Sequence, residues 1–214
     1  MSMTRLFAVA LVIAAPLAAH AELIVNGSFE AEVINAGSWT VLPSLTGWSA
    51  DASSGVELRN GVSGTAHQGA NYVELDTNPG KFGNSTFDSS TNSSIWQTVA
   101  TQAGQTYDLS WAYSPRAGVA ATSNDILVYW NNTLLTTNTG SGVGKPNHVW
   151  SVFNFQVSGT GSDTLRFMAG GAADRLGGSL DSVSMTAAVP EPGTYALMIA
   201  GLAAVGFMAR RRAA

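Results

Sequence analysis

The chain contains no cysteine, and only three of its 214 residues are histidines. A cysteine nucleophile and disulfides are therefore both excluded, so a hydrophobic core, with or without a metal ion, must hold the fold together. Two histidines, His67 and His148, remain beyond the N-terminal segment described below. They are too few for a histidine-rich zinc site.

Charge is also scarce, since charged residues make up 11% of the chain. Between residues 22 and 187, six basic residues stand against thirteen acidic ones, a balance of −7. Such a surface repels phosphate, which excludes nucleic acid as a partner. The abundance of Gly, Ser, Thr and Asn is typical of an extracellular β protein with many turns. No helical periodicity of useful length precedes the C-terminal tail.

The N-terminus has the pattern of a secretory signal peptide. Arg5 precedes an apolar stretch from Leu6 to Ala19, and Ala19-His20-Ala21 forms a small-x-small cleavage site. We therefore expect residues 1–21 to be a signal peptide, the protein to be exported, and the mature chain to begin at Glu22.

The C-terminal tail has three parts: Pro190-Glu191-Pro192, an uncharged run from Gly193 to Ala209, and Arg210-Arg211-Arg212. A helix over the run would measure roughly 25 Å, near the lower limit for crossing a bilayer core, so the tail predicts a single transmembrane helix. The arginines would keep its end in the cytoplasm. The prolines favour an extended backbone ahead of the helix, and a processing enzyme can bind an extended segment.

This order of motif, apolar run and arginine cluster resembles the PEP-CTERM sorting signal of Gram-negative bacteria, here residues 188–214. The resemblance implies processing by an exosortase, a membrane-embedded transpeptidase-like enzyme. It also implies an intermediate anchored in the inner membrane, followed by delivery to the cell surface or the extracellular matrix, where exopolysaccharide is a possible partner. An ordinary C-terminal membrane anchor is the alternative.

Between the two ends, strand signals recur about every ten residues. Tyr107 to Tyr113 alternates apolar with small or polar residues, as a half-buried strand does. Ile126 to Trp130 suits a central strand, and Asn131-Asn132 turns it into a hairpin with Leu134-Leu135. The segment Phe153 to Val157 alternates and returns through Leu165 and Phe167, which predicts a second hairpin. Weaker candidates are Leu23 to Val25, Val56 to Arg59, Asn71 to Leu75, Ile95 to Val99 and Leu180 to Thr186, with a long polar loop from Asn78 to Ser94.

These short strands, with no crossover helices, predict an all-β domain over residues 22–187: an antiparallel β-sandwich, most simply a jelly roll. The segments Leu23 to Glu30, Gly47-Trp48 and Leu180 to Met185 resemble the first and last strands of galactose-binding-like jelly rolls, which include carbohydrate-binding modules. The resemblance implies a structural Ca²⁺ bound by Glu30 and Asp181, with Ser182 where many relatives have a second acid. Alternatively, both are ordinary turn and edge acids.

Catalytic signals are weak. No Gly-x-Ser-x-Gly elbow occurs, and the segment Thr139 to Pro146 departs from a phosphate-binding loop at both ends, which favours a flexible hairpin loop. Glu74 and Asp76 alternate onto one strand face and would suit a hydrolytic carboxylate pair, although such neighbours are more often solvated or metal-binding.

The residues that suggest sugar binding are aromatic, because sugar rings lie against aromatic faces while their hydroxyls need planar polar partners. Trp39 sits in a Gly/Ser-rich segment expected to be a loop, and Trp96 follows the polar loop, so we expect these two to be exposed, whereas Trp111 should be core. Arg116 follows a proline at a strand end, and Asn124 opens the next strand. Arg116 would line a cleft or pair with Asp125.

The sequence therefore favours a non-catalytic, exported, carbohydrate-binding or matrix protein with ligand residues Trp39, Trp96, Arg116 and Asn124. The alternatives are a surface polysaccharide hydrolase that uses a carboxylate pair, and a purely structural matrix protein.

Overall fold

The structure, a computed structural model, describes residues 21–78, 91–188 and 192–212. The predicted signal peptide and the Pro190-Glu191 part of the sorting motif lie outside these residues, apart from Ala21. Most of the polar loop expected between Asn78 and Ser94 lies outside them as well.

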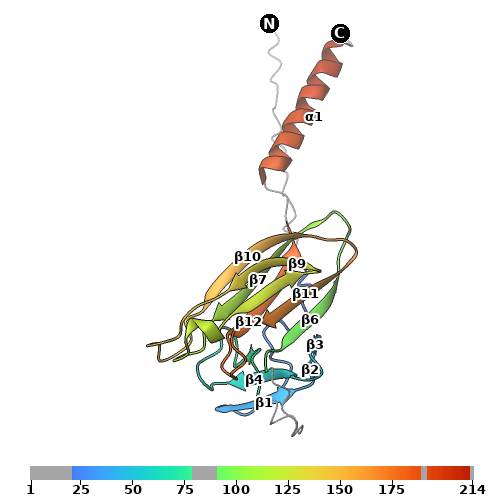
Figure 1. Cartoon of the computed structure of the whole chain (residues 1–214). Helices are drawn as coiled ribbons and strands as arrows, with labels where there is room; N and C mark the ends of the chain where they lie inside the picture. Colours follow the sequence, from blue (N-terminus) through green and yellow to red (C-terminus); the bar gives the residue numbers. More distant parts are fainter. Residues whose placement is uncertain (1–20, 79–90, 189–191, 213–214) are drawn as a thin grey trace.

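Two six-stranded sheets pack face to face, and every strand pair in the described residues is antiparallel (Figure 1). Sheet A has the order β1 (Ser38–Leu42), β4 (Val56–Asn60), β5 (Asn71–Glu74), β12 (Ser179–Ala187), β7 (Thr106–Ser114) and β10 (Ser151–Ser158). Sheet B has the order β2 (Ser44–Leu45), β3 (Trp48–Ala50), β6 (Ser94–Ala100), β11 (Ser162–Ala169), β8 (Ile126–Trp130) and β9 (Thr133–Asn138). The predicted all-β, antiparallel sandwich is confirmed.

The core forms between the sheets because alternate residues of each strand point inward. In β7 the inward residues Tyr107, Leu109, Trp111 and Tyr113 are all buried, as the alternation predicts. The ring of Trp111 packs against Phe167 of the facing sheet. Core positions on β4 and β5 follow the same period, which leaves their polar residues on the outer face of sheet A.

The structure corrects three expectations about the strands. The segment Leu23 to Val25 forms no strand, although the Leu23 N–H donates to the Met185 carbonyl at 2.9 Å. The second predicted hairpin is wrong, because β10 pairs with β7 in sheet A while β11 pairs with β6 and β8 in sheet B. The chain therefore crosses from one sheet to the other between Ser158 and Ser162. Trp39, expected in a loop, lies in β1, which was missed together with β2 and β3.

A helix, α1 (Pro192–Arg212), follows the sandwich and covers the expected apolar run. No helix in the described part of the chain is both long and apolar enough to cross a membrane, so the prediction of a transmembrane helix is corrected. The uncharged part of α1, Gly193 to Ala209, is shorter than the roughly 20 apolar residues that a spanning helix usually needs, and Arg210–Arg212 follow it directly.

Candidate functional site

A cluster of charged side chains lies on the outer face of sheet A, where β4 and β5 are neighbours. Val56, Leu58 and Val73 point into the core, so the alternating residues Glu57, Arg59, Tyr72 and Glu74 project from the opposite face. Glu57 and Glu74 are directly opposite each other in the strand register. All four outward side chains are nevertheless buried, which means that loops cover this part of the sheet.

Two arginines share the two glutamates. The guanidinium of Arg59 contacts Glu57 and lies 3.3 Å, from Nε to Oε2, from Glu74. Arg116, which follows β7, donates from Nη1 to Glu74 Oε1 at 2.6 Å and to the Arg175 carbonyl at 3.1 Å. Glu74 thus joins an arginine of its own sheet to one from a loop.

Burial dominates the protonation of these acids. It raises the pKa of Glu74 to about 8, against the opposing effect of the Arg59 and Arg116 charges. Burial also raises the pKa of Glu57, although the Arg59 charge and hydrogen bond act in the opposite direction. The buried Tyr72 hydroxyl has its pKa raised to about 12 for the same reason.

Above this cluster is a hollow, which we call the cup, with a volume of about 340 Å³. Its lining combines one aromatic ring, several planar polar groups and a few apolar side chains: Trp39, Glu57, Arg59, Val62, Asn78, Arg116, Asp174, Arg175 and Leu176. The Arg59 guanidinium carbon is 5.9 Å from the centre of the Trp39 ring, close enough for a cation–π contact.

Glu74 and Asp76, considered above as a carboxylate pair, fix one wall of the cup. Asp76 Oδ2 accepts from the N–H groups of Asp174 and Leu176 at 2.9 and 3.1 Å. Glu74 Oε1 accepts from the Gly177 N–H at 3.1 Å. Both carboxylates are fully buried, so they anchor the loop that precedes β12.

The structure brings two of the four predicted ligand residues together, since Trp39 and Arg116 both line the cup. Arg116 pairs with Glu74 and not, as considered above, with Asp125. Asn124 is fully buried, and its Oδ1 accepts from the Arg116 N–H at 2.9 Å, so it fixes the backbone of Arg116 and does not line the cup itself. Trp96 lies on sheet B, with the Arg166 guanidinium 4.9 Å above its ring, beside a separate hollow.

Sequence reasoning missed Glu57 and Arg59, the centre of the cluster. A usable signal was present, because both charges alternate with Val56 and Leu58 within a predicted strand. Their common partner, Glu74, is distant in sequence, so the cluster itself had no local pattern.

The two predicted metal ligands lie near one segment, residues 67–71. Glu30 Oε1 accepts from the N–H groups of Ala70 and Asn71 at 2.9 and 2.7 Å. Asp181 Oδ2 accepts from those of His67 and Gln68 at 2.7 and 2.9 Å. Burial raises the pKa of Asp181 to about 6, and the nearby charge of Glu30 contributes to the rise. Within the described residues, no group of three or more His, Cys, Asp or Glu side chains is placed to hold a metal.

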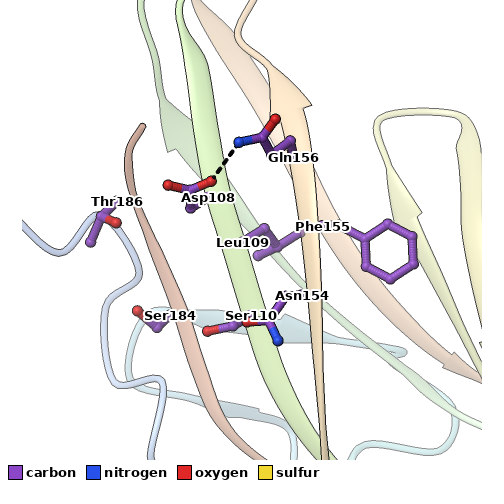
Figure 2. Close-up of a pocket in the computed structure, with 8 residues that line it drawn as sticks. All are labelled: Asp108, Leu109, Ser110, Asn154, Phe155, Gln156, Ser184 and Thr186. Carbon is purple, nitrogen blue, oxygen red and sulfur yellow. Dashed lines mark hydrogen bonds between the residues drawn. The ribbon is translucent and has the colours of Figure 1, made fainter. Parts of the chain in front are cut away.

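A second hollow, of about 390 Å³, opens on the same outer face across β12, β7 and β10 (Figure 2). Its polar lining residues are Asp108, Ser110, Asn154, Gln156, Ser184 and Thr186. Gln156 donates to Asp108 at 3.0 Å across the two strands, as Figure 2 shows. Unlike the cup, this hollow has no exposed aromatic face, because Phe155 stacks on the core residue Trp111.

Comparison with known proteins identifies the tail. Residues 188–212 match the PEP-CTERM protein-sorting motif, which marks the protein as one sorted for export. Of the motif residues, Pro192 and Arg210–Arg212 lie in α1. No curated protein matches the chain in sequence.

Several solved structures resemble the sandwich. The Stig cyclase FisC from Fischerella sp. TAU is 13% identical with a TM-score of 0.53, over 80% of this chain and all of that one. The carbohydrate-binding module TmCBM61, solved with β-1,4-galactotriose, is 18% identical with a TM-score of 0.45, over 78% and 99% of the two chains. A family 35 carbohydrate-binding module from Clostridium thermocellum is 12% identical with a TM-score of 0.40, over 70% and 98%. The chain therefore carries a PEP-CTERM sorting motif behind a β-sandwich fold that known proteins share.

Proposed function

We propose that the protein is a non-catalytic glycan-binding protein and that the cup on sheet A is its binding site. The observation that carries this proposal is the meeting of Trp39 with Arg59 and Arg116 in one hollow of about 340 Å³. A sugar ring needs an apolar face to lie against and planar groups for its hydroxyls, and these side chains supply both. The volume is at the lower end for small-ligand sites, enough for one or two sugar rings.

The buried ion cluster supports binding by holding the polar groups in place. Arg116 is fixed through its side chain by Glu74 and through its backbone by Asn124. Arg59 is held between Glu57 and Glu74. Preorganised donors lose little conformational freedom when a ligand arrives, which favours affinity.

The sorting motif bears on where the protein is delivered. We propose that an exosortase-type enzyme processes the tail at the inner membrane and that the protein then resides at the cell surface or in the extracellular matrix of a Gram-negative bacterium. Exopolysaccharide at that location is the glycan class that we expect the cup to bind. A protein with only a structural role in the matrix would show no such binding.

A structural Ca²⁺ at Glu30 and Asp181 remains part of the proposal. Their carboxylates are hard oxygen ligands, and a cation would offset the repulsion between the buried Asp181 and its like-charged neighbour. Backbone carbonyls or water would have to complete the coordination. When bound, the ion would add to the hydrogen bonds by which these two acids already hold residues 67–71.

A second candidate function, polysaccharide hydrolysis, rests on one observation. Two carboxyl groups, Glu57 and Glu74, face each other in the cluster, and burial keeps the pKa of Glu74 near 8, as a general acid requires. The contacts of Glu74 Oε1 with Arg116 and Gly177 argue against this role, because both favour the ionised carboxylate, whereas a general acid must carry a proton.

The test is a panel of neutral and acidic polysaccharides incubated with the purified protein, scored for both binding and released sugar. We expect binding without release. Sugar release that disappears in Glu74→Gln would replace the binding proposal with hydrolysis, and neither binding nor release would leave only the structural role.

A further inference from the structure

Strand β10 forms one edge of sheet A and lacks the features that normally protect an edge. Its eight residues, Ser-Val-Phe-Asn-Phe-Gln-Val-Ser, include no charge and no proline, and its register with β7 has no bulge. Figure 1 shows it at the margin of the sandwich. Natural proteins usually block such an edge, because its free N–H and C=O groups pair readily with another strand.

The other edges of the described sheets are less suited to pairing. The opposite edge of sheet A, β1, has five residues, and β2 in sheet B has two. The remaining edge, β9, has six residues and an irregular register with β8 near Val128 and Tyr129. The longest regular edge is therefore β10.

The direction of its backbone groups follows from β7. The Ala188 N–H donates to the Thr106 carbonyl, so Thr106 and every second residue after it face β12. The alternate residues of β7 face β10, where their partners are Ser151, Phe153, Phe155 and Val157. The residues of β10 that point their N–H and C=O groups away from the sheet are then Val152, Asn154, Gln156 and Ser158.

One of these outward groups is already used, since the Ser158 carbonyl accepts from Trp130 Nε1 at 3.0 Å. The remaining three, Val152, Asn154 and Gln156, are evenly spaced around Asn154. That spacing suits a two-fold axis at Asn154, which would place Asn154 opposite its own copy and Val152 opposite Gln156 of the second copy. All outward N–H and C=O groups of these three residues would then be paired.

We propose that the protein forms a two-fold dimer through antiparallel pairing of β10 with β10 of a second copy, in the register centred on Asn154. The pairing joins the two copies of sheet A into one continuous sheet. The occupant is a second copy of this chain, because the same three residues supply complementary groups on both sides of the axis.

The side chains agree with this register. Phe153 would face Phe155 of the second copy, and such cross-strand aromatic pairs stabilise a sheet. In the single chain both rings are only half-buried, stacked at 6.0 and 5.3 Å on Trp111. On the outer face Val152 is 54% exposed and has Gln156 of the second copy as its neighbour in the dimer. Figure 2 shows Asn154 and Gln156 on this strand among the polar residues of the second hollow, which would continue across the axis.

A charge-reversal pair tests the register. Asn154→Lys would place two positive charges opposite each other and should weaken self-association at least tenfold in sedimentation of the purified full chain. Asn154→Glu should do the same alone, whereas a mixture of the two variants should associate again as a heterodimer. Ala52→Lys, an exposed loop substitution near the opposite edge of the sheets, is the matched control and should leave association unchanged.

Crosslinking tests the same contact independently of affinity. The chain has no cysteine, and opposed residues in a hydrogen-bonded pair lie about 5.5 Å apart between Cα atoms, within disulfide range. Asn154→Cys should therefore crosslink to its copy on oxidation, whereas Gln156→Cys should not, because its two copies would lie about 14 Å apart at roughly 3.4 Å per residue. A chain that stays monomeric at all concentrations, or an Asn154→Lys variant that associates like the parent, would overturn the proposal.

Discussion

Replacing Asn124 by alanine should destabilise the sandwich and loosen the cup together. Its Oδ1 accepts from the Arg116 N–H at 2.9 Å, and its Nδ2 donates to the carbonyls of Ala120 and Val119 at 2.8 and 3.2 Å. The side chain is fully buried, so alanine would leave one donor and two acceptors without these partners and open a small void.

The magnitude follows from these three hydrogen bonds. Each costs about 1 kcal/mol when its buried partner is left unsatisfied, so we expect a loss of about 3 kcal/mol in the free energy of unfolding. For a domain of this size, this corresponds to a fall of about 6 to 12 °C in melting temperature.

The assay is thermal unfolding followed by circular dichroism, with Asn132→Ala as the control. Asn132 lies in the turn between β8 and β9 and is exposed, so its replacement should change the stability by less than about 0.5 kcal/mol. Melting of Asn124→Ala within about 2 °C of the parent would refute the reasoning, because it would mean that these hydrogen bonds do not hold the loop.

Three further predictions concern the acids and the tail. The pKa of Glu74 is raised from 4.5 to about 8, so the free energy of unfolding should fall as pH rises between these values, by up to about 5 kcal/mol at 1.36 kcal/mol per pH unit. Urea unfolding at a series of pH values measures this fall, which Glu74→Gln should flatten. The same pH dependence in variant and parent would show that Glu74 is ionised throughout. Added Ca²⁺ at a hundred times its dissociation constant should raise the melting temperature by about 5 to 10 °C relative to EDTA. Asp181→Asn should abolish the difference, and identical melting of the parent in both solutions would contradict a bound ion. Replacing Pro190, Glu191 and Pro192 by alanine should leave export intact and block processing; a wild-type cell-associated protein that still ends at Ala214 by mass spectrometry would contradict exosortase processing.

The sequence predicted the sandwich where strands are long and alternate cleanly. In β7 the alternation decides which residues are buried, so its inward face followed directly from the residue pattern. The continuous apolar run Ile126–Trp130 likewise has the bounds of β8. Strands β1, β2 and β3 have two to five residues among turns, too few for a period to emerge. The wrong hairpin of β10 with β11 has another cause, because alternation gives the buried face of a strand and not the sheet that it joins.

The candidate site was only partly predictable for a similar reason. Trp39 and Arg116 were identified as residue types suited to sugars, yet their proximity depends on β1 and the loop after β7 meeting over sheet A. Glu74 and Asp76 were identified as a pair from their spacing, but their actual partners, Arg116 and the loop before β12, come from distant parts of the chain. Asn124 looked like a ligand residue because it opens a strand, whereas burial makes it a support.

The central claim is that Trp39 and its neighbours form the glycan site. The most direct test is a calorimetric titration of two tryptophan variants with the glycan that the polysaccharide panel identifies. Trp39→Ala removes the aromatic wall of the cup, and we expect affinity to fall at least tenfold, since aromatic contacts are worth roughly 0.5 to 1.5 kcal/mol beyond the area they bury. Trp96→Ala is the matched control, a half-buried tryptophan that also lies under an arginine but on the other sheet, and it should bind like the parent. Unchanged affinity in Trp39→Ala, or a loss confined to Trp96→Ala, would contradict the assignment of the cup.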